Sequence, residues 1–186
     1  MIQVASEMQA RAKRTSWNTL CWAPTDNGTG GVTPGEGVLL YGLVRSLRPR
    51  NLLEWGTGYG HGTLHIAQAC QDNGAGHLWT FEIGAVQAAE AGQNIAAAGL
   101  SGIVTQCVPP PAGLPQIDFA FIDAGHTLKD VEEYMDSFTL SPGGVIVIHD
   151  ADYQHNAQQI AAIWGMPIVV LPTDSAAGLA ILGGVL

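Results

Sequence analysis

Basic residues are scarce in this chain of 186 residues, and nearly all of them lie near its start. Seven Lys and Arg stand against 16 Asp and Glu, for a formal net charge of −9, and Lys129 is the only Lys or Arg after Arg50. Proteins that bind nucleic acid need Lys and Arg side chains to neutralise phosphates. We therefore expect no nucleic-acid partner.

Cysteines are few and long apolar runs are absent. Cys21, Cys70 and Cys107 form no C-x-x-C pair, so neither a zinc site nor a disulfide framework is indicated. No uncharged apolar run is long enough to span a bilayer, and the first ten residues have no signal-peptide pattern. We expect a cytoplasmic protein with reduced thiols and no membrane partner.

Short apolar segments alternate with helical ones from Asn51 onward. This alternation indicates one α/β domain over residues 1–186, with a mostly parallel sheet and helices on both faces. Residues 1–36 form a separate N-terminal segment, in which 15–34 is predicted as a loop, and 37–186 form the core. The patterns predict strands at 51–54, 77–81, 103–108, 117–122, 144–149, 167–171 and 178–182, and helices at 37–47, 63–72, 85–98, 128–138 and 156–164.

A glycine-rich turn directly after the first predicted strand is the most informative motif. Glu54 ends that strand, and Gly56, Gly58 and Gly60 follow at every second position. Glycines let the backbone turn sharply and approach a ligand closely, and the helix predicted at 63–72 directs its N-terminus at that ligand. An acid before the glycines suits a cationic group, such as the ammonium and sulfonium of S-adenosylmethionine (SAM), better than a pyrophosphate.

Two other glycine motifs fit the sequence less well. A dinucleotide-binding fingerprint needs Gly-x-Gly-x-x-Gly, and no register of these glycines has that spacing. A phosphate loop needs a lysine directly after its last glycine, and no lysine lies between Lys13 and Lys129. A turn that binds no ligand remains the plain alternative.

Polar residues follow the predicted strands at the point where each strand ends. Parallel strands place their carboxyl ends at one edge of a sheet, where ligands bind. Any one of these residues could cap a helix or face solvent, but together they predict a site. The set comprises Glu54, Glu82, Asp123, His126, His149 and Asp150.

Three segments carry a resemblance to a known family. The segment from Leu53 to Gly60 resembles motif I of the class I SAM-dependent methyltransferases. Residues 118–126 (Asp-Phe-Ala-Phe-Ile-Asp-Ala-Gly-His) and 141–150 (Ser-Pro-Gly-Gly-Val-Ile-Val-Ile-His-Asp) are similar to small-molecule O-methyltransferases of the catechol and caffeoyl-CoA type and to a bacterial branch with an Asp-x-x-His element. The resemblance covers about residues 33 to 182 and implies a Rossmann-like methyltransferase fold with a seven-stranded, mostly parallel sheet ending in an antiparallel hairpin.

The resemblance implies cofactor contacts for the residues at the first two strand ends. The three glycines would line the methionine part of SAM, with Glu54 near its ammonium group. Glu82 would accept hydrogen bonds from both ribose hydroxyls, and Ile83 would pack on the adenine. Residues 1–36 would form a short lid over the acceptor. Trp17 and Trp22 could form an aromatic wall of that lid, but we favour the alternative in which they pack on the sheet edge.

The resemblance also implies catalytic and metal-binding roles. Asp123 and Asp150 match positions that bind a divalent cation in metal-dependent relatives, and His126 matches a catalytic base. A cation such as Mg²⁺ lowers the pKa of a bound hydroxyl, and a histidine can accept the proton. Ala151 stands where relatives have an Asn ligand, so His149 could complete the metal site and would favour Mn²⁺, Fe²⁺ or Zn²⁺. We expect Asp123, with His126 or His149 as the base, to form the catalytic group.

These features predict an O-methyltransferase that moves a methyl group from SAM to a hydroxyl of a small-molecule acceptor, with optional help from a divalent metal. A SAM-binding regulatory or structural protein without catalysis is the first alternative. A nicotinamide-dependent oxidoreductase is the second, disfavoured by the glycine spacing. Relatives often dimerise, so a homodimer is also considered. Of the remaining histidines, His61 is expected near the site and His65 on a helix surface.

Overall fold

The computed structural model describes residues 31–108, 113–125, 127–151, 156–173 and 178–183. Trp17, Trp22 and His126 lie outside these ranges, so the roles predicted for them stay predictions.

The described residues alternate between strands and helices, close to the predicted pattern. The strands are β1 (Asn51–Trp55), β2 (His77–Phe81), β3 (Val104–Cys107), β4 (Ile117–Ile122), β5 (Leu140–His149), β6 (Ile168–Leu171) and β7 (Leu179–Gly183). The helices are α3 (Pro34–Leu47), α4 (His61–Asn73), α5 (Ala85–Ala97), α6 (Leu128–Asp136) and α7 (Asn156–Trp164). None of these helices has the length and hydrophobicity needed to cross a bilayer.

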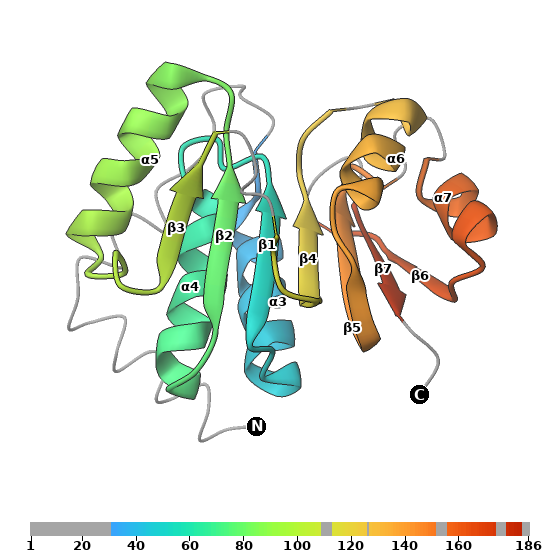
Figure 1. Ribbon diagram of the computed structural model, residues 1–186, viewed down its shortest axis with the longest axis horizontal. Helices are drawn as coiled ribbons and strands as arrows, with labels where there is room; N and C mark the ends of the chain where they lie inside the picture. Colours follow the sequence, from blue (N-terminus) through green and yellow to red (C-terminus); the bar gives the residue numbers. More distant parts are fainter. Residues whose placement is uncertain (1–30, 109–112, 126, 152–155, 174–177, 184–186) are drawn as a thin grey trace.

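The strands form one sheet in the order β3-β2-β1-β4-β5-β7-β6. β1 pairs in parallel with both β2 and β4, whereas β7 pairs antiparallel with β5 and β6. Figure 1 shows the arrowheads of β1 to β4 at one common edge and that of β7 directed the other way. The predicted parallel sheet with a terminal antiparallel hairpin is confirmed. The strand order reverses between β1 and β4, which is where open α/β sheets bind ligands.

Helices cover both faces of the sheet, as predicted. One face packs on α3, α4 and α5 in a core that includes Leu40 and Leu52. The other packs on α6 and α7 in a core that includes Leu53, Val131 and Ile160. Leu52 and Leu53 are consecutive but enter different cores because side chains alternate along a strand. Each fully buried leucine stabilises the fold by about 2 kcal/mol.

Helix α3 begins at Pro34, three residues before its predicted start at Gly37. Thr33 Oγ1 accepts the N–H of Glu36 at 3.3 Å, and Glu36 Oε2 accepts the N–H of Thr33 at 2.9 Å. This capping box, with proline in the first turn, is a common helix start. The loop predicted over 15–34 was therefore wrong at Pro34, which belongs to α3. The earlier start also places Glu36 inside the helix.

Strand β5 begins at Leu140, four residues before its predicted start. Ile117 of β4 pairs with Leu140, but Phe119 pairs with Val145, so the register shifts between the two pairs. β5 therefore has more residues than β4 between these two pairs, and the irregularity that accommodates them lies near the start of β5. The end of β5, and with it His149, keeps its predicted place.

Candidate active site

Backbone contacts with two neighbouring strands fix the glycine-rich turn after β1. Gly56 and Thr57 both donate N–H hydrogen bonds to the carbonyl oxygen of Phe81, at 3.0 and 3.1 Å. Gly56 has a φ of +92°, and a Cβ there would collide with the carbonyl oxygen of Asp123. Glycine is the residue that tolerates this positive φ and has no Cβ to collide. The turn therefore joins the ends of β1, β2 and β4.

Glu82, directly after β2, holds the turn from the other side. Its Oε2 accepts the N–H of Gly58 at 2.8 Å, and its Oε1 accepts the N–H of Gly84 at 2.7 Å. Each carboxylate oxygen has a further lone pair, so the group can still accept two hydroxyl donors. The neighbouring Ile83 side chain is 94% exposed. An apolar surface therefore lies beside an oriented carboxylate.

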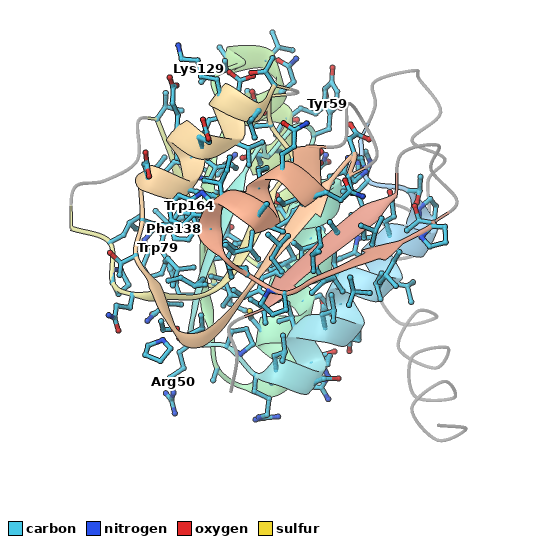
Figure 2. All side chains as sticks on the ribbon, turned by 90° about the vertical axis from the view of Figure 1, so that its right-hand side faces the viewer. Arg50, Tyr59, Trp79, Lys129, Phe138 and Trp164 are labelled. Atoms are coloured by element: carbon cyan, nitrogen blue, oxygen red, sulfur yellow. The ribbon has the colours of Figure 1, made fainter. Side chains whose placement is uncertain are left out.

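A cavity of about 290 Å³ lies at this edge of the sheet. Its walls come from the segment before α3, the glycine-rich turn, the start of α4 and the ends of β2 and β4. Figure 2 shows Tyr59 of the turn at this edge and Arg50, directly before β1, at the opposite edge. The residues around the cavity include Val32, Thr57, Gly58, His61, Glu82 and Asp123.

Glu54 is fully buried at the end of β1. Its Oε2 accepts hydroxyl hydrogen bonds from Thr63 at 2.5 Å and from Thr80 at 2.6 Å. Burial raises the pKa of Glu54 to about 8, although the two hydroxyl groups oppose the shift. At neutral pH the carboxyl group is therefore mostly protonated.

The second oxygen of Glu54 lies behind a glycine in the cavity wall. Oε1 has no hydrogen-bond partner among the described residues. A Cβ at Gly62 would lie 2.8 Å from this oxygen, and Gly62 lines the cavity. A buried oxygen without a partner calls for one from a ligand, and a cationic donor bound there would favour the ionised form of Glu54.

His149 ends β5 and is enclosed by carboxyl groups. Its Nδ1 lies 2.9 Å from Asp123 Oδ1 and 3.4 Å from Asp150 Oδ1, and its Nε2 lies 3.1 Å from Glu36 Oε2. Burial alone would lower the pKa of His149, but the three acids outweigh it and raise the pKa to about 12. The imidazole is therefore a cation at neutral pH.

Asp123 lies between this cluster and the cavity, which it lines. Burial raises the pKa of Asp123, His149 opposes the rise, and Asp150 and Glu36 add to it. A carboxyl group with a raised pKa at a cavity wall is suited to exchange a proton with a ligand.

Glu36 belongs to the same cluster, although no motif singled it out. Its side chain is fully buried, and its Oε1 accepts the hydroxyl of Thr173 at 2.6 Å. It reaches His149 from a position 113 residues earlier in the chain. The capping pattern Thr33-x-x-Glu36 could have located the start of α3, but nothing in the sequence indicates that its acid turns inward.

The predicted metal ligands Asp123, His149 and Asp150 meet at the end of β5. Asp123, His149 and Asp150 are neighbours, and Nδ1 of His149 faces the two carboxylates without a hydrogen-bond partner among the described residues. Within the described ranges, no group of three His, Cys, Asp or Glu residues is arranged to hold a metal ion. The metal-binding role of Asp123, His149 and Asp150 therefore stays a prediction.

The structure also places the remaining histidines of the prediction. His61 lines the cavity, as expected. The surface position predicted for His65 is wrong, because this side chain is only 2% exposed. Its ring fills the space above Gly37 of α3, where a Cβ would collide with it.

Comparison with known proteins gives a family match and one curated relative. A family model described as a methyltransferase domain matches residues 53–151, more than half of the chain. A catechol O-methyltransferase of Niastella koreensis is 32% identical over 130 residues, which are 64% of this chain and 57% of the relative. The chain thus matches somewhat more than half the length of that relative.

Solved structures resemble the whole described core. The O-methyltransferase TomG from Streptomyces achromogenes, involved in tomaymycin synthesis and solved with SAM, is 23% identical, with a TM-score of 0.69 over 94% of this chain and 88% of TomG. An O-methyltransferase from Bacillus cereus, solved with S-adenosylhomocysteine (SAH), is 21% identical, with a TM-score of 0.66 over 96% of this chain and 90% of that one. These likenesses confirm the predicted Rossmann-like methyltransferase fold.

Proposed function

The chain belongs to the methyltransferase domain family, and on that premise we propose that it transfers a methyl group from SAM to a hydroxyl group of a small-molecule acceptor. The observation that carries this proposal is a single cavity lined both by Glu82, an oriented acceptor for ribose hydroxyls, and by Asp123, a carboxyl group suited to take a proton. The name of the curated relative, a catechol O-methyltransferase, supports the same reaction class.

The methyl donor is proposed to lie along the glycine-rich turn. Glu82 accepts the two ribose hydroxyls with oxygens that backbone N–H groups already orient, and Ile83 packs on the adenine. The unpartnered Glu54 Oε1 behind Gly62 fits an ammonium group. The N-terminus of α4 has no side-chain cap, so its N–H groups fit a carboxylate.

The chemistry is an in-line displacement in which much of the acceleration comes from positioning. The acceptor oxygen bonds to the methyl carbon as the carbon–sulfur bond breaks, and SAH leaves. The hydroxyl proton must go to a base. We assign that role to Asp123, because it lines the cavity and burial raises its pKa. His126, outside the described residues, is the other candidate.

His149 has a different role in this proposal from that of a base. His149 is buried and is not among the residues that line the cavity, so we do not assign it the role of the base. We assign it the task of holding Asp123 in place. A divalent cation held by Asp123, His149 and Asp150 stays a prediction, and no proposed step is routed through it.

A small molecule with a hydroxyl group is the partner we propose. The excess of acidic residues after Arg50 supports our expectation that nucleic acid is not a partner. A homodimer and a cytoplasmic location remain predictions. Light scattering on the purified protein tests the first, and fractionation of the source cells tests the second.

Calorimetric titration with SAH tests the cofactor site. We expect SAH to bind with a micromolar dissociation constant and NAD to give no heat of binding. Equal binding of the two ligands, or no binding of SAH, would contradict the proposal. NAD is the informative control because it shares the ribose and adenine of SAH but lacks its amino-acid part.

Turnover is tested separately with SAM and catechol as the probe acceptor. We expect SAH to accumulate with catechol and not with benzene, which has no hydroxyl group. If SAH binds but no hydroxyl compound in a wider panel is methylated, the non-catalytic SAM-binding alternative replaces this proposal.

A further inference from the structure

Strand β6 forms one edge of the sheet and consists only of apolar residues. Its residues are Ile168, Val169, Val170 and Leu171, and β6 stands last in the strand order, after β7. Val169 is 58% exposed, and the other three are partly exposed. Proteins usually protect such an edge with charged residues, proline or a bulge, because its free backbone groups can pair with another strand. Within its four residues, β6 has none of these protections.

The opposite edge of the sheet, strand β3, is polar. Its exposed residues are Thr105 and Gln106. Thr105 Oγ1 forms a hydrogen bond with Nε2 of His77 at 2.8 Å, and Gln106 Nε2 donates to the carbonyl oxygen of Ala88 at 3.0 Å. Figure 1 shows β3 and β6 on opposite sides of the molecule. The exposed apolar edge is therefore a feature of β6 and not of the sheet in general.

The segment that contains β6 is uncharged, although the chain has a strong net charge. Residues 156–171 span α7, β6 and the connection between them and include no Asp, Glu, Lys or Arg, whereas the net charge is −9. Ile163 and Trp164 at the end of α7 are 55% and 41% exposed, and Figure 2 views the molecule from this side, with Trp164 labelled. Two copies of an acidic chain repel each other, but contact through this segment brings no like charges together. The segment therefore suits a second copy of this chain.

The hydrogen bonds between β6 and β7 determine which backbone groups of β6 point outward. Gly183 donates its N–H to the carbonyl oxygen of Pro167, in line with the antiparallel register of the two strands. Hydrogen-bonded and non-hydrogen-bonded pairs alternate along antiparallel strands, so Val169 bonds to β7. Ile168 and Val170 consequently direct their N–H and C=O groups away from β7, toward the open edge.

We propose that two copies of this chain pair through β6 as antiparallel strands, related by a twofold axis that passes through Val169. In that register Ile168 of one copy lies opposite Val170 of the other, and their outward N–H and C=O groups form two hydrogen bonds in each of two equivalent pairs. Val169 lies opposite its own equivalent as a non-hydrogen-bonded pair.

This register makes β6 complementary to itself. Opposite residues in the pairing lie on the same face of the sheet, because side chains alternate along each strand. The exposed Val169 side chains of the two copies then cover each other, and the two sheets join into one. The interface is isologous, since the same residues of both copies form it. It does not depend on the proposed methyl transfer.

Engineered cysteines test the register directly. The Cα atoms of a non-hydrogen-bonded pair lie about 4.5 Å apart, within the range that a disulfide spans. The purified full-length Val169→Cys variant should therefore form a covalent dimer under mild oxidation, detected by non-reducing gel electrophoresis. Val86→Cys is the matched control, because Val86 on α5 is 71% exposed; it should give no more dimer than the parent chain. Equal yields from the two variants would overturn the inference.

Light scattering at increasing concentration tests association of the unmodified chain. We expect the mass to rise from 19.5 kDa toward twice that value. Val169→Lys places two like charges opposite each other on the twofold axis and should weaken association at least about tenfold, whereas Val86→Lys should not. A parent chain that stays monomeric at its highest soluble concentration would overturn the inference. A dimer that Val169→Cys does not cross-link would also overturn it, because another surface would then hold the two copies together.

Discussion

Two regions at the same edge of the sheet bury carboxyl groups and neutralise them in different ways. At the end of β1, Glu54 is surrounded by hydroxyl groups and apolar side chains, and its raised pKa keeps a proton on it. At the end of β5, three acids share one imidazolium. Glu54 has an oxygen that can still bond to a ligand, whereas the acids around His149 already face a charged ring. The first region therefore suits ligand binding, and the second suits the fixing of geometry.

The two regions also differ in their dependence on pH. Folded Glu54 has a pKa of about 8 against an ordinary 4.5, so between these values the folded state holds a proton that the unfolded state has released. Folded His149 has a pKa of about 12 against 6.5, and the same holds between those values. In both windows the free energy of unfolding falls as pH rises. The two windows overlap only above pH 6.5, so the range from pH 4.5 to pH 6.5 reports on Glu54 alone of these two groups.

Removal of the imidazolium should have the largest effect on stability. His149→Ala leaves Asp123, Asp150 and Glu36 without a counter-charge, and breaking a buried ion pair in this way costs about 3–5 kcal/mol. Urea denaturation at neutral pH measures the change. His77→Ala, at the half-buried start of β2, is the control and should lose less than about 1 kcal/mol. A small loss at both positions would contradict the ion cluster.

Replacement of the other buried acid should change the pH dependence instead. Glu54→Gln keeps the shape and the hydroxyl contacts but cannot ionise. Between pH 5 and pH 6.5, below the window of His149, the parent chain should lose up to about 2 kcal/mol of unfolding free energy, and the variant should lose much less. Urea denaturation at several pH values measures both curves. Parallel curves would show that Glu54 is not the group responsible.

Most of the fold could be predicted because the strands of a parallel sheet are buried on both faces and appear as short apolar runs. Leu52 and Leu53 illustrate this, since each fills a different core. Strand ends follow from those runs, and so Glu54, Glu82, Asp123 and His149 were predicted together at one edge. Their common edge follows from topology alone.

The partners of these residues could not be predicted, because they depend on contacts between distant segments. Glu36 reaches His149 across 113 residues, and its role depends on where α3 meets the sheet. His65 is buried because Gly37, on another helix, leaves room for its ring. The residue types at the end of β5 predict a metal site, and the orientation of the imidazole ring of His149 between its neighbours follows only from the fold.

The glycine-rich turn connects the two regions, and Gly56→Ala tests that connection. The change combines a φ of +92° with a collision against the Asp123 carbonyl, and we expect a loss of about 2–3 kcal/mol of stability together with weaker SAH binding. Gly99→Ala isolates the backbone part, since Gly99 has a φ of +73° and open space around it. It should lose about 1 kcal/mol and keep SAH affinity. Equal losses would mean that the turn does not depend on Asp123.

The smallest expected effect concerns the binding region alone. Glu82→Ala removes the proposed acceptor for the ribose hydroxyls and should weaken SAH binding by about 1–3 kcal/mol, measured by calorimetry. Glu90→Ala, an exposed acid on α5, is the control and should not change it. Because Glu82 also accepts two backbone N–H groups, the unfolding free energy of each variant must be compared as well. A loss of affinity with little loss of stability would place Glu82 among the ligand contacts, and unchanged affinity would remove it from the site. A large loss of both would make it a support of the turn, and the cavity would then have to recognise the ribose through backbone groups.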